Sequence, residues 1–325
     1  MNERYFVDIP KDKKRVVVIG GGTGTYTVLS GLKKYPHVFP IAIVTMADDG
    51  GSTGALRTSL GVLPPGDIRR ALVALSEAEE TVLNLFNYRF PSGAVEGHSF
   101  GNLFLAALEK TLGGFDRAVE EASRILRVRG AVVPVTLDKV RLHAEYADGS
   151  MAHGETNIDI PKHDAQLRLK RVWLDPSGAL NPKAREAICS ADLVIVGPGD
   201  LYTSIVPNLL VRGMQDALKE SKAPKVYVVN VMTKLGETHG FCAHMFVEEI
   251  TRHIGENVLT HVLYNTAQPE ERFLEFYSAE GAVYVVCDEQ LLPKGPQYLA
   301  HDVLAIGSLI RHDPDKLARV LTSLL

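Results

Sequence analysis

The sequence predicts an α/β fold, a doubly wound and mostly parallel Rossmann-like sheet with an inserted β-hairpin layer. Short apolar runs rich in valine and isoleucine alternate with stretches of helical periodicity along most of the chain. The runs are apolar on both faces, as are strands of a parallel sheet that helices cover on either side. From about 130 to 175 the pattern alternates and carries turn signals, which predicts hairpins. We therefore expect one domain over residues 1–325 with a β-rich insertion at about 130–175.

The composition excludes several classes of protein. The 325 residues are 46% hydrophobic, which is enough for a sizeable core. A net charge of −4 without a basic block argues against nucleic acid as a partner. No apolar run reaches the roughly 18 residues of a membrane span, and the N-terminal segment lacks the apolar stretch of a signal peptide. The three scattered cysteines fit no disulfide framework, so we expect a protein of the reducing cytoplasm.

The first element is a strand that begins near Val16 and runs into a glycine-rich turn and a helix. Glycines lack a Cβ, so backbone N–H groups can close on an anion, and the positive end of the helix dipole adds to the same spot. This predicts a phosphate or pyrophosphate site; the alternative is a turn that only packs the helix on the sheet. The candidates are Gly20, Gly21, Gly22, Thr23 and Gly24, with the helix expected to start near Thr25.

The turn matches neither of the two common nucleotide motifs. In the GxGxxG register the third glycine is replaced by Thr25 or Thr27, depending on where the motif begins. A Walker loop is excluded because no GK[ST] follows. The pattern therefore predicts an anion site without naming the nucleotide.

The next elements follow the same alternation. A second strand at about 40–46 ends in Asp48 and Asp49, and a loop over 51–66 leads to a helix whose expected N-cap is Asp67. Further helices are expected at 97–113, 115–128 and 316–325, and further strands within 191–200 and 225–233 and at 261–266.

The segments that follow the predicted strands are rich in glycine and polar residues. In doubly wound sheets, ligands bind outside the carboxyl ends of the strands, so these segments should meet at one edge. They lie at 20–24, 47–54, 197–204 and 230–238. Together they predict an extended polar crevice.

Carboxylates and arginines dominate the second of these segments and the helix beyond it. Asp48 and Asp49 can accept hydrogen bonds from ribose hydroxyls or hold a divalent cation such as Mg²⁺; alternatively, each closes a turn. Arginines can bind phosphate with bidentate geometry, although one of Arg69 and Arg70 is expected on the solvated helix face. The candidates of this region are Asp48, Asp49, Gly50, Ser52, Arg57, Asp67 and Arg69.

The later segments add an imidazole, hydroxyls and amides. His98 stands at a helix start, where it can be a ligand-facing proton donor; the alternative is a structural bond beside a Ser99 cap. No GxSxG or Cys–His signature marks a nucleophile, and no catalytic residue is assigned. The candidates of this region are His98, Asn102, Gly197, Pro198, Gly199, Tyr202, Thr203, Ser204, Asn230 and Thr233.

Read together, these blocks resemble the CofD/YvcK family, and most closely its YvcK branch, the gluconeogenesis factors of bacteria. The blocks lie in order over residues 16–238, and the flanking sequence is compatible, so the resemblance covers nearly the whole chain. They read VVVIGGGTGTYTVLSGLKKY, ADDGGSTGALR, PPGDIRRALVALS, GHSFGNLFLAAL, GPGDLYTSIVPNLL and NVMTKLGET.

The resemblance implies a nucleotide-binding domain. CofD members are transferases that join 2-phospho-L-lactate, from a nucleoside-diphosphate-activated form, to a deazaflavin. YvcK-like members bind UDP-sugars, notably UDP-N-acetylglucosamine (UDP-GlcNAc), and affect cell shape and growth on gluconeogenic carbon sources. By this analogy the glycine turn, Asp48, Asp49, Asn230 and Thr233 line a nucleotide-sugar site. The resemblance further implies a homodimer, a protein partner related to the cell wall and no obligatory cofactor.

Two positions depart from the family pattern. Asp200 stands where serine usually follows GPG, and Lys234-Leu235 stands where glutamine and proline usually sit. A carboxylate near a diphosphate is repulsive unless it points away or is neutralised, and Lys234 can supply the compensating charge. We expect these changes to affect the preference for sugar and phosphate rather than the fold.

Three functions remain open on the sequence alone. The first is a UDP-sugar-binding regulator of cell shape and cell-wall precursor flow. The second is a CofD-like transferase in which Asp48 or Asp49 holds a divalent metal that neutralises charge on a diphosphate. The third is an NAD-binding protein, because a strand, a glycine turn, a helix and a later acidic pair come close to the dinucleotide pattern.

Overall fold

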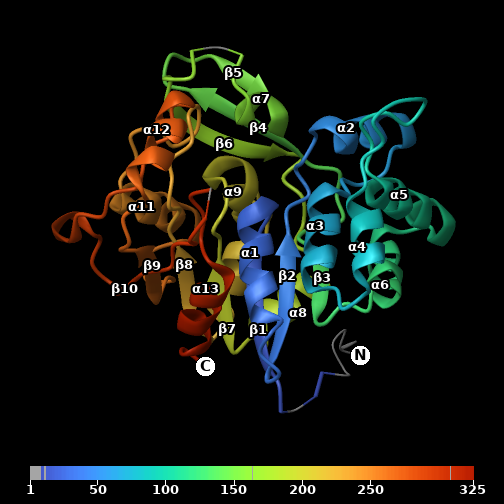
Figure 1. The fold of residues 1–325 in the computed structure, drawn as a ribbon, viewed down its shortest axis with the longest axis horizontal. Helices are drawn as coiled ribbons and strands as arrows, with labels where there is room; N and C mark the ends of the chain where they lie inside the picture. The colour runs from blue at the N-terminus through green and yellow to red at the C-terminus, as the bar shows by residue number, and fades with distance from the viewer. Residues whose placement is uncertain (1–8, 11, 163, 308) are drawn as a thin grey trace.

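A seven-stranded parallel sheet forms the centre of the molecule, as Figure 1 shows. The computed structural model describes residues 9–10, 12–162, 164–307 and 309–325. The strand order is β10-β9-β8-β7-β1-β2-β3. The strands are β1 (Lys14–Gly20), β2 (Val38–Val44), β3 (Ala131–Pro134), β7 (Leu193–Val196), β8 (Lys225–Val228), β9 (His261–Asn265) and β10 (Gln297–His301). The predicted doubly wound sheet is confirmed.

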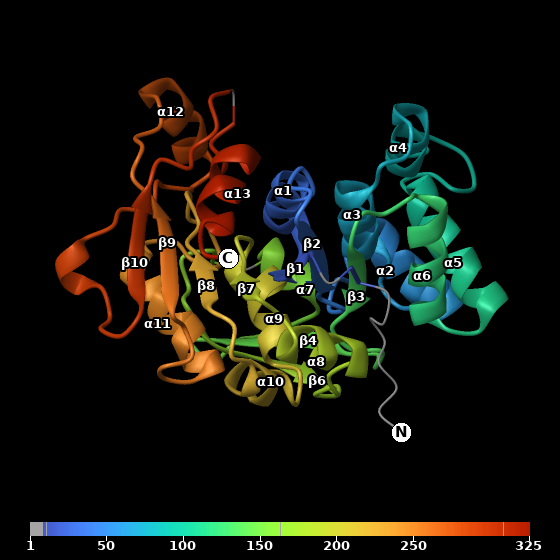
Figure 2. The same cartoon turned by 90° about the horizontal axis from the view of Figure 1, so that it is seen from below.

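The sheet forms because its central strands are apolar on both faces. Val16–Ile19 of β1 and Leu193–Val196 of β7 are fully buried, and they pair in parallel with Val16 opposite Leu193. Figure 2 shows α1 (Gly22–Leu32), α3 (Gly66–Leu75) and α13 (Pro314–Thr322) on one face of the sheet. The opposite face carries α8 (Pro182–Cys189), α10 (Met214–Glu220) and α11 (Ala243–Ile254).

The remaining helices lie around this core. Four of them gather beyond β3, namely α2 (Gly51–Leu60), α4 (Glu80–Asn87), α5 (Phe100–Leu112) and α6 (Phe115–Ile125). The others are α7 (Glu155–Asp159), the π-helical turn η1 (Leu201–Ile205), α9 (Val206–Leu209), α12 (Glu271–Ala279) and the 3₁₀ turn η2 (Glu289–Leu291). None of the described helices combines the length and apolar character that crossing a membrane requires.

A second, antiparallel sheet lies over the carboxyl ends of the main strands, at the top of Figure 1. Its strand order is β5-β4-β6, with β4 (Arg141–Tyr146), β5 (Met151–His153) and β6 (Leu169–Asp175). On β4, Leu142, Ala144 and Tyr146 are buried while the residues between them face outward. This is the hairpin layer that the alternation predicts. The predicted insertion began at about 130, however, and its first strand, β3, pairs in parallel with β2 in the main sheet.

Several predicted boundaries need correction. The expected loop at 51–66 contains α2, whose glycines mask the helical pattern; at Gly54 a Cβ would lie 2.0 Å from the carbonyl oxygen of Asp49. The first helix begins at Gly22 rather than near Thr25, and the second strand covers Val38–Val44 rather than 40–46. Strand β10 and helices such as α11 and α12 were not expected.

Asp67 is not the N-cap of its own helix. Helix α3 already begins at Gly66, and its cap residue is Pro65. The Asp67 carboxylate instead accepts the backbone N–H of Gly22, at the start of α1. It therefore satisfies a free donor of the neighbouring helix, which only the parallel arrangement of β1 and β2 brings near.

Candidate functional site

A cavity of about 660 Å³ lies at the carboxyl edge of the parallel sheet, between the segments that follow its strands and helix α7 of the insertion. Its walls come from the turn after β1, the start of α2 and α3, helix α7, and the loops after β7 and β8. The volume is in the range of pockets that hold nucleotide-sized ligands. The predicted residues that line it are Gly21, Gly22, Thr23, Gly24, Asp48, Gly50, Ser52, Asp67, Arg69, Asn102, Gly199, Thr203 and Ser204.

The other predicted residues lie close by without lining this cavity. Asp49 turns away, since its Oδ1 accepts from the backbone N–H of Thr156 at 3.0 Å. Arg57 donates to the carbonyl oxygens of Asp48 and Val140, and Thr233 Oγ1 accepts from the backbone N–H of Val283. The complete set is Gly20, Thr25, Asp49, Arg57, His98, Gly197, Pro198, Tyr202, Asn230 and Thr233; of these, Pro198 and Asn230 line a smaller cavity of about 170 Å³ that shares Gly199 with the first.

Sequence reasoning missed much of the cavity wall. The missed residues sit at the start of α3, on the inserted helix α7, on α12, and in loops that no predicted strand precedes. No signal at a strand end marks them. They are Gly66, Arg89, Glu155, Thr156, Asp159, Ile160, Tyr277, Ile310 and Arg311.

The glycine turn brings the N-terminus of α1 to the cavity. Gly22 has φ of +64°, a conformation that favours glycine. A Cβ at Gly21 would lie 2.6 Å from Oδ2 of Asp67, so only glycine leaves room for that carboxylate. Helix α2 opens into the same cavity at Gly51 and Thr53. Two helix N-termini therefore present their positive ends to one space.

Acidic and basic side chains line the cavity in equal number, five of each: Asp48, Asp67, Glu155, Asp159 and Asp200 against Arg69, Arg70, Arg89, Lys234 and Arg311. Anion binding thus depends on which acids carry charge. Burial raises the pKa of Asp67 to about 6, and the charge of Asp48 adds to the rise. Burial and the charge of Asp48 raise the pKa of Glu155 to about 9, so its carboxyl is neutral at pH 7. With Glu155 neutral, the five basic side chains of the lining outnumber its charged acids.

The arginines have different roles. Arg69 is buried, its Nε donates to Asn102 Oδ1 at 3.1 Å, and burial lowers its pKa to about 10. Arg70 is half-exposed, and its Nη1 lies 3.2 Å from Asp67 Oδ1. Arg69 thus stabilises the cavity wall through its hydrogen bond to Asn102, whereas the half-exposed guanidinium of Arg70 is available to a ligand.

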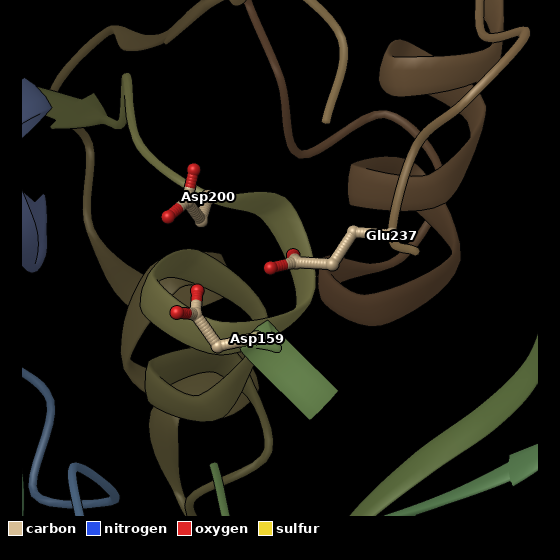
Figure 3. A group of neighbouring side chains, drawn as sticks. All are labelled: Asp159, Asp200 and Glu237. Atoms are coloured by element: carbon tan, nitrogen blue, oxygen red, sulfur yellow. The ribbon is translucent and has the colours of Figure 1, made fainter. Parts of the chain in front are cut away.

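Lys234 joins three carboxylates at the far wall of the cavity. Its Nζ pairs with Asp159 of α7, with Asp200 at 2.8 Å and with Glu237 at 3.2 Å. Figure 3 shows these three carboxylates pointing toward one another. Burial alone would lower the pKa of Lys234, but the charges of Glu237, Asp200 and Asp159 outweigh it and raise that pKa. The two departures from the family pattern, Asp200 and Lys234, therefore compensate each other.

Glu237 anchors this cluster. Its side chain is 0% exposed, and it accepts from the backbone N–H of Tyr202 at 3.0 Å and from Thr203 Oγ1 at 2.9 Å. The backbone N–H of Tyr202 and the hydroxyl of Thr203 therefore stabilise the cavity wall, and these two donors are not available to a ligand. Through Lys234 the cluster ties α7 to the loops that follow β7 and β8.

His98 lies behind the cavity and contacts a residue that lines it. Its Nδ1 is 2.9 Å from Ser52 Oγ, and Asn102 Nδ2 is 3.2 Å from the same oxygen. Ser99 caps α5 by accepting the backbone N–H of Asn102. The Ser99 cap and the hydrogen-bonded imidazole are the structural alternative considered for this segment, and His98 itself does not line the cavity.

Replacing Glu155 by glutamine is expected to stabilise the protein at alkaline pH. A carboxyl whose folded-state pKa is raised to about 9 binds a proton in the folded state that the unfolded chain has lost, so stability falls as pH rises toward 9. Glutamine cannot ionise, so Glu155→Gln should raise the free energy of unfolding by about 1–2 kcal/mol at pH 8.5 and by less at pH 6. Urea unfolding at both pH values measures it, with the exposed Glu256→Gln as control. Equal pH dependence of Glu155→Gln and the wild type would contradict the assignment.

Comparison with known proteins gives matches over nearly the whole chain. A family model described as "2-phospho-L-lactate transferase CofD" matches residues 16–304. A "Gluconeogenesis factor" of Halalkalibacterium halodurans is 42% identical over 313 residues, which are 95% of this chain and 96% of that protein. A protein of the same name from Listeria monocytogenes is 40% identical over 324 residues, 96% of each chain.

A crystal structure of a protein from Bacillus halodurans has a TM-score of 0.91 at 41% identity, covering 95% of this chain and 99% of that one. With this sheet, this cavity and these relatives, the chain belongs to the CofD family and is similar to its members named gluconeogenesis factors.

Proposed function

We propose that the protein binds a nucleotide sugar of the UDP-GlcNAc type in this cavity and acts as a regulator. The regulated processes are cell shape, the flow of cell-wall precursors and growth on gluconeogenic carbon sources. The observation that carries the binding proposal is that the N-termini of α1 and α2 open into one cavity beside Arg70, Arg89 and Arg311. Helix N-termini and arginines are the groups that bind a diphosphate.

The rest of the cavity suits the remainder of such a ligand. Tyr277, Ile160 and Ile310 supply aromatic and aliphatic surface for a base or a sugar ring. The Asp200 carboxylate can accept hydrogen bonds from sugar hydroxyls, since Lys234 neutralises part of its charge. In this proposal the diphosphate lies at the helix ends and the sugar lies toward the Lys234 cluster.

Regulation would follow from ordering of the cavity walls. The segments 47–60 and 230–240 both contribute to the cavity and continue onto the surface. A bound ligand that orders them would change a surface that a protein partner of the cell-wall machinery contacts. A homodimer is proposed for the assembly, and light scattering of the purified protein with and without ligand measures it.

Calorimetric titration tests the binding proposal. UDP-GlcNAc is expected to bind saturably, and GDP and NAD more weakly, each measured with and without Mg²⁺. Arg70→Ala is expected to weaken UDP-GlcNAc binding about tenfold or more, which corresponds to about 1.4 kcal/mol. The control Arg117→Ala removes the same charge from an exposed position on α6 and should leave the affinity unchanged. No heat of binding at millimolar UDP-GlcNAc would contradict the proposal, and preferential binding of NAD would favour a dinucleotide site.

A second function is favoured by a specific pair of acids. Asp48 and Asp67 both line the cavity. Burial raises the pKa of both carboxyls, the charge of Asp48 adds to the rise of Asp67, and Thr53 donates a hydrogen bond to Asp48. Two such carboxylates fit Mg²⁺, which prefers oxygen ligands next to phosphate. A bound ion would neutralise charge on a diphosphate in a transferase of the CofD kind, with Arg70 orienting the phosphate. In this assignment Asp67 replaces Asp49, which contacts Thr156 instead. Recovery of chemically altered nucleotide from incubations with Mg²⁺, and its loss in Asp67→Asn, would establish turnover.

A further inference from the structure

A chain of hydrogen bonds leads from Arg69 through Asn102 and Ser52 to His98. Arg69 Nε is 3.1 Å from Asn102 Oδ1, Asn102 Nδ2 is 3.2 Å from Ser52 Oγ, and Ser52 Oγ is 2.9 Å from His98 Nδ1. The four residues come from α3, α5, α2 and the segment before α5. Ser52 is 8% exposed, and it lines the cavity while His98 stands behind it.

The chemistry of the guanidinium sets the direction of the first two bonds. Arg69 has only donors, so Asn102 presents its carbonyl oxygen to Arg69 and its amide nitrogen to Ser52. Ser52 Oγ therefore accepts from Asn102 and keeps its own hydrogen for another acceptor. His98 Nδ1, at 2.9 Å, is such an acceptor when the imidazole is neutral with its proton on Nε2.

The surroundings of Ser52 are suited to attack on a phosphate group. A hydroxyl oxygen has two lone pairs; Asn102 uses one, and the second is available for a new bond when Ser52 donates to His98. Ser52 is the second residue of α2, where unpaired backbone N–H groups of the first turn stabilise negative charge. Arg70 and Arg89 line the same cavity.

We infer that Ser52 is a nucleophile that His98 activates, and that it attacks an electrophilic phosphorus in the cavity. No local sequence motif marks this pair, because Ser52 and His98 stand 46 residues apart on different elements. Resting on the proposed function, the electrophile is the phosphorus of the diphosphate that carries the sugar. Ser52 Oγ forms a bond to that phosphorus, the bond to the bridging oxygen breaks, and nucleoside monophosphate leaves with the electron pair. The hydroxyl proton passes to His98 Nδ1.

Diisopropyl fluorophosphate tests the inference without knowledge of the natural ligand. The reaction forms the Oγ–phosphorus bond and breaks the phosphorus–fluorine bond, with the proton going to His98 and fluoride leaving. Intact mass measurement should show one added diisopropylphosphoryl group on the wild type, and peptide mapping should assign it to Ser52. Ser52→Ala should lose the label. The control Ser59→Ala should keep it, because Ser59 is exposed on the same helix and donates to the carbonyl oxygen of Ala55.

The role of His98 is tested by His98→Gln, which can accept a hydrogen bond from Ser52 but cannot take its proton. The labelling rate is expected to fall about 100-fold or more. Absence of label on the wild type, label on another residue such as Ser204, or an unchanged rate in His98→Gln would overturn the inference. The first two results need no variant, so they hold even if a substitution impairs folding. Calorimetry with UDP-GlcNAc is independent, so binding without labelling would leave the proposed function in place and remove only the covalent step.

Discussion

Replacing Gly24 by valine is expected to destabilise the protein by about 3 kcal/mol and to weaken ligand binding. Gly24 lies in the first turn of α1, where a Cβ would stand 2.2 Å from the carbonyl oxygen of Pro198. That contact is with backbone, so relief requires α1 or the loop after β7 to move. Both line the cavity through Gly24 and Gly199. The same displacement should therefore separate the groups proposed to bind the diphosphate.

Urea unfolding followed by circular dichroism measures this effect. The matched control is Gly307→Val, because a Cβ at Gly307 meets nothing within 4 Å. The control should differ from the wild type by less than about 0.5 kcal/mol. If the two variants were equally stable, the close approach of α1 to the loop after β7 would not be a feature of the protein in solution.

Replacing Lys234 by methionine is expected to cost about 3 kcal/mol at pH 8.5. The substitution leaves Asp159, Asp200 and Glu237 together without their shared cation, and the Glu237 side chain is fully buried. Asp159 and Asp200 are 30% and 45% exposed, so solvent screens part of the repulsion and the cost stays at the lower end for a buried ion pair.

The pH dependence of this variant follows from Glu237. Burial raises the pKa of Glu237 to about 7, against the lowering charge of Lys234. Without Lys234 the pKa of Glu237 rises further. Above pH 7 the folded variant therefore keeps a proton on Glu237 that the unfolded chain has already released, because an exposed glutamate titrates at about 4. The loss of stability should therefore grow as pH rises above 7 and shrink as pH falls toward 5.

Unfolding of Lys234→Met in urea at pH 5.5 and pH 8.5 measures this dependence. The double variant Lys234→Met, Glu237→Gln should recover part of the loss at pH 8.5, because its buried group carries no charge. A loss that is the same at both pH values would contradict the role of Lys234 as the counter-ion of Glu237.

The parallel sheet and the polar cavity at its carboxyl edge could be predicted from the sequence, because both depend on local patterns. Valine-rich and isoleucine-rich runs such as 16–19 and 193–196 are typical of strands buried on both faces. The glycine turn after β1 indicates close approach of other groups to its backbone; the structure shows this at Gly21 with the Asp67 side chain and at Gly24 with the Pro198 backbone. These properties require no knowledge of distant contacts.

The parts that could not be predicted depend on contacts between distant segments. Asp67 faces Gly22 rather than its own helix, and Ser52 faces His98. Helix α2 was hidden by Gly51 and Gly54, which are poor helix formers in general. Gly54 is required here by the close approach of the Asp49 carbonyl oxygen, and Gly51 has a positive φ of +41°, which favours glycine. The edge strand β10 is half-exposed and lacks an apolar run. No local pattern marks Glu155 or Tyr277 as part of a cavity wall.

The central claim is that the cavity at the carboxyl edge of the sheet binds a nucleotide sugar through its diphosphate. A crystal structure of the protein grown with UDP-GlcNAc, at a concentration that calorimetry shows to be saturating, tests it most directly. We predict electron density for the diphosphate between the N-terminus of α1 at Gly22 and the guanidinium of Arg70. Density for the nucleotide outside this cavity, or a cavity that holds only water at that concentration, would contradict the claim.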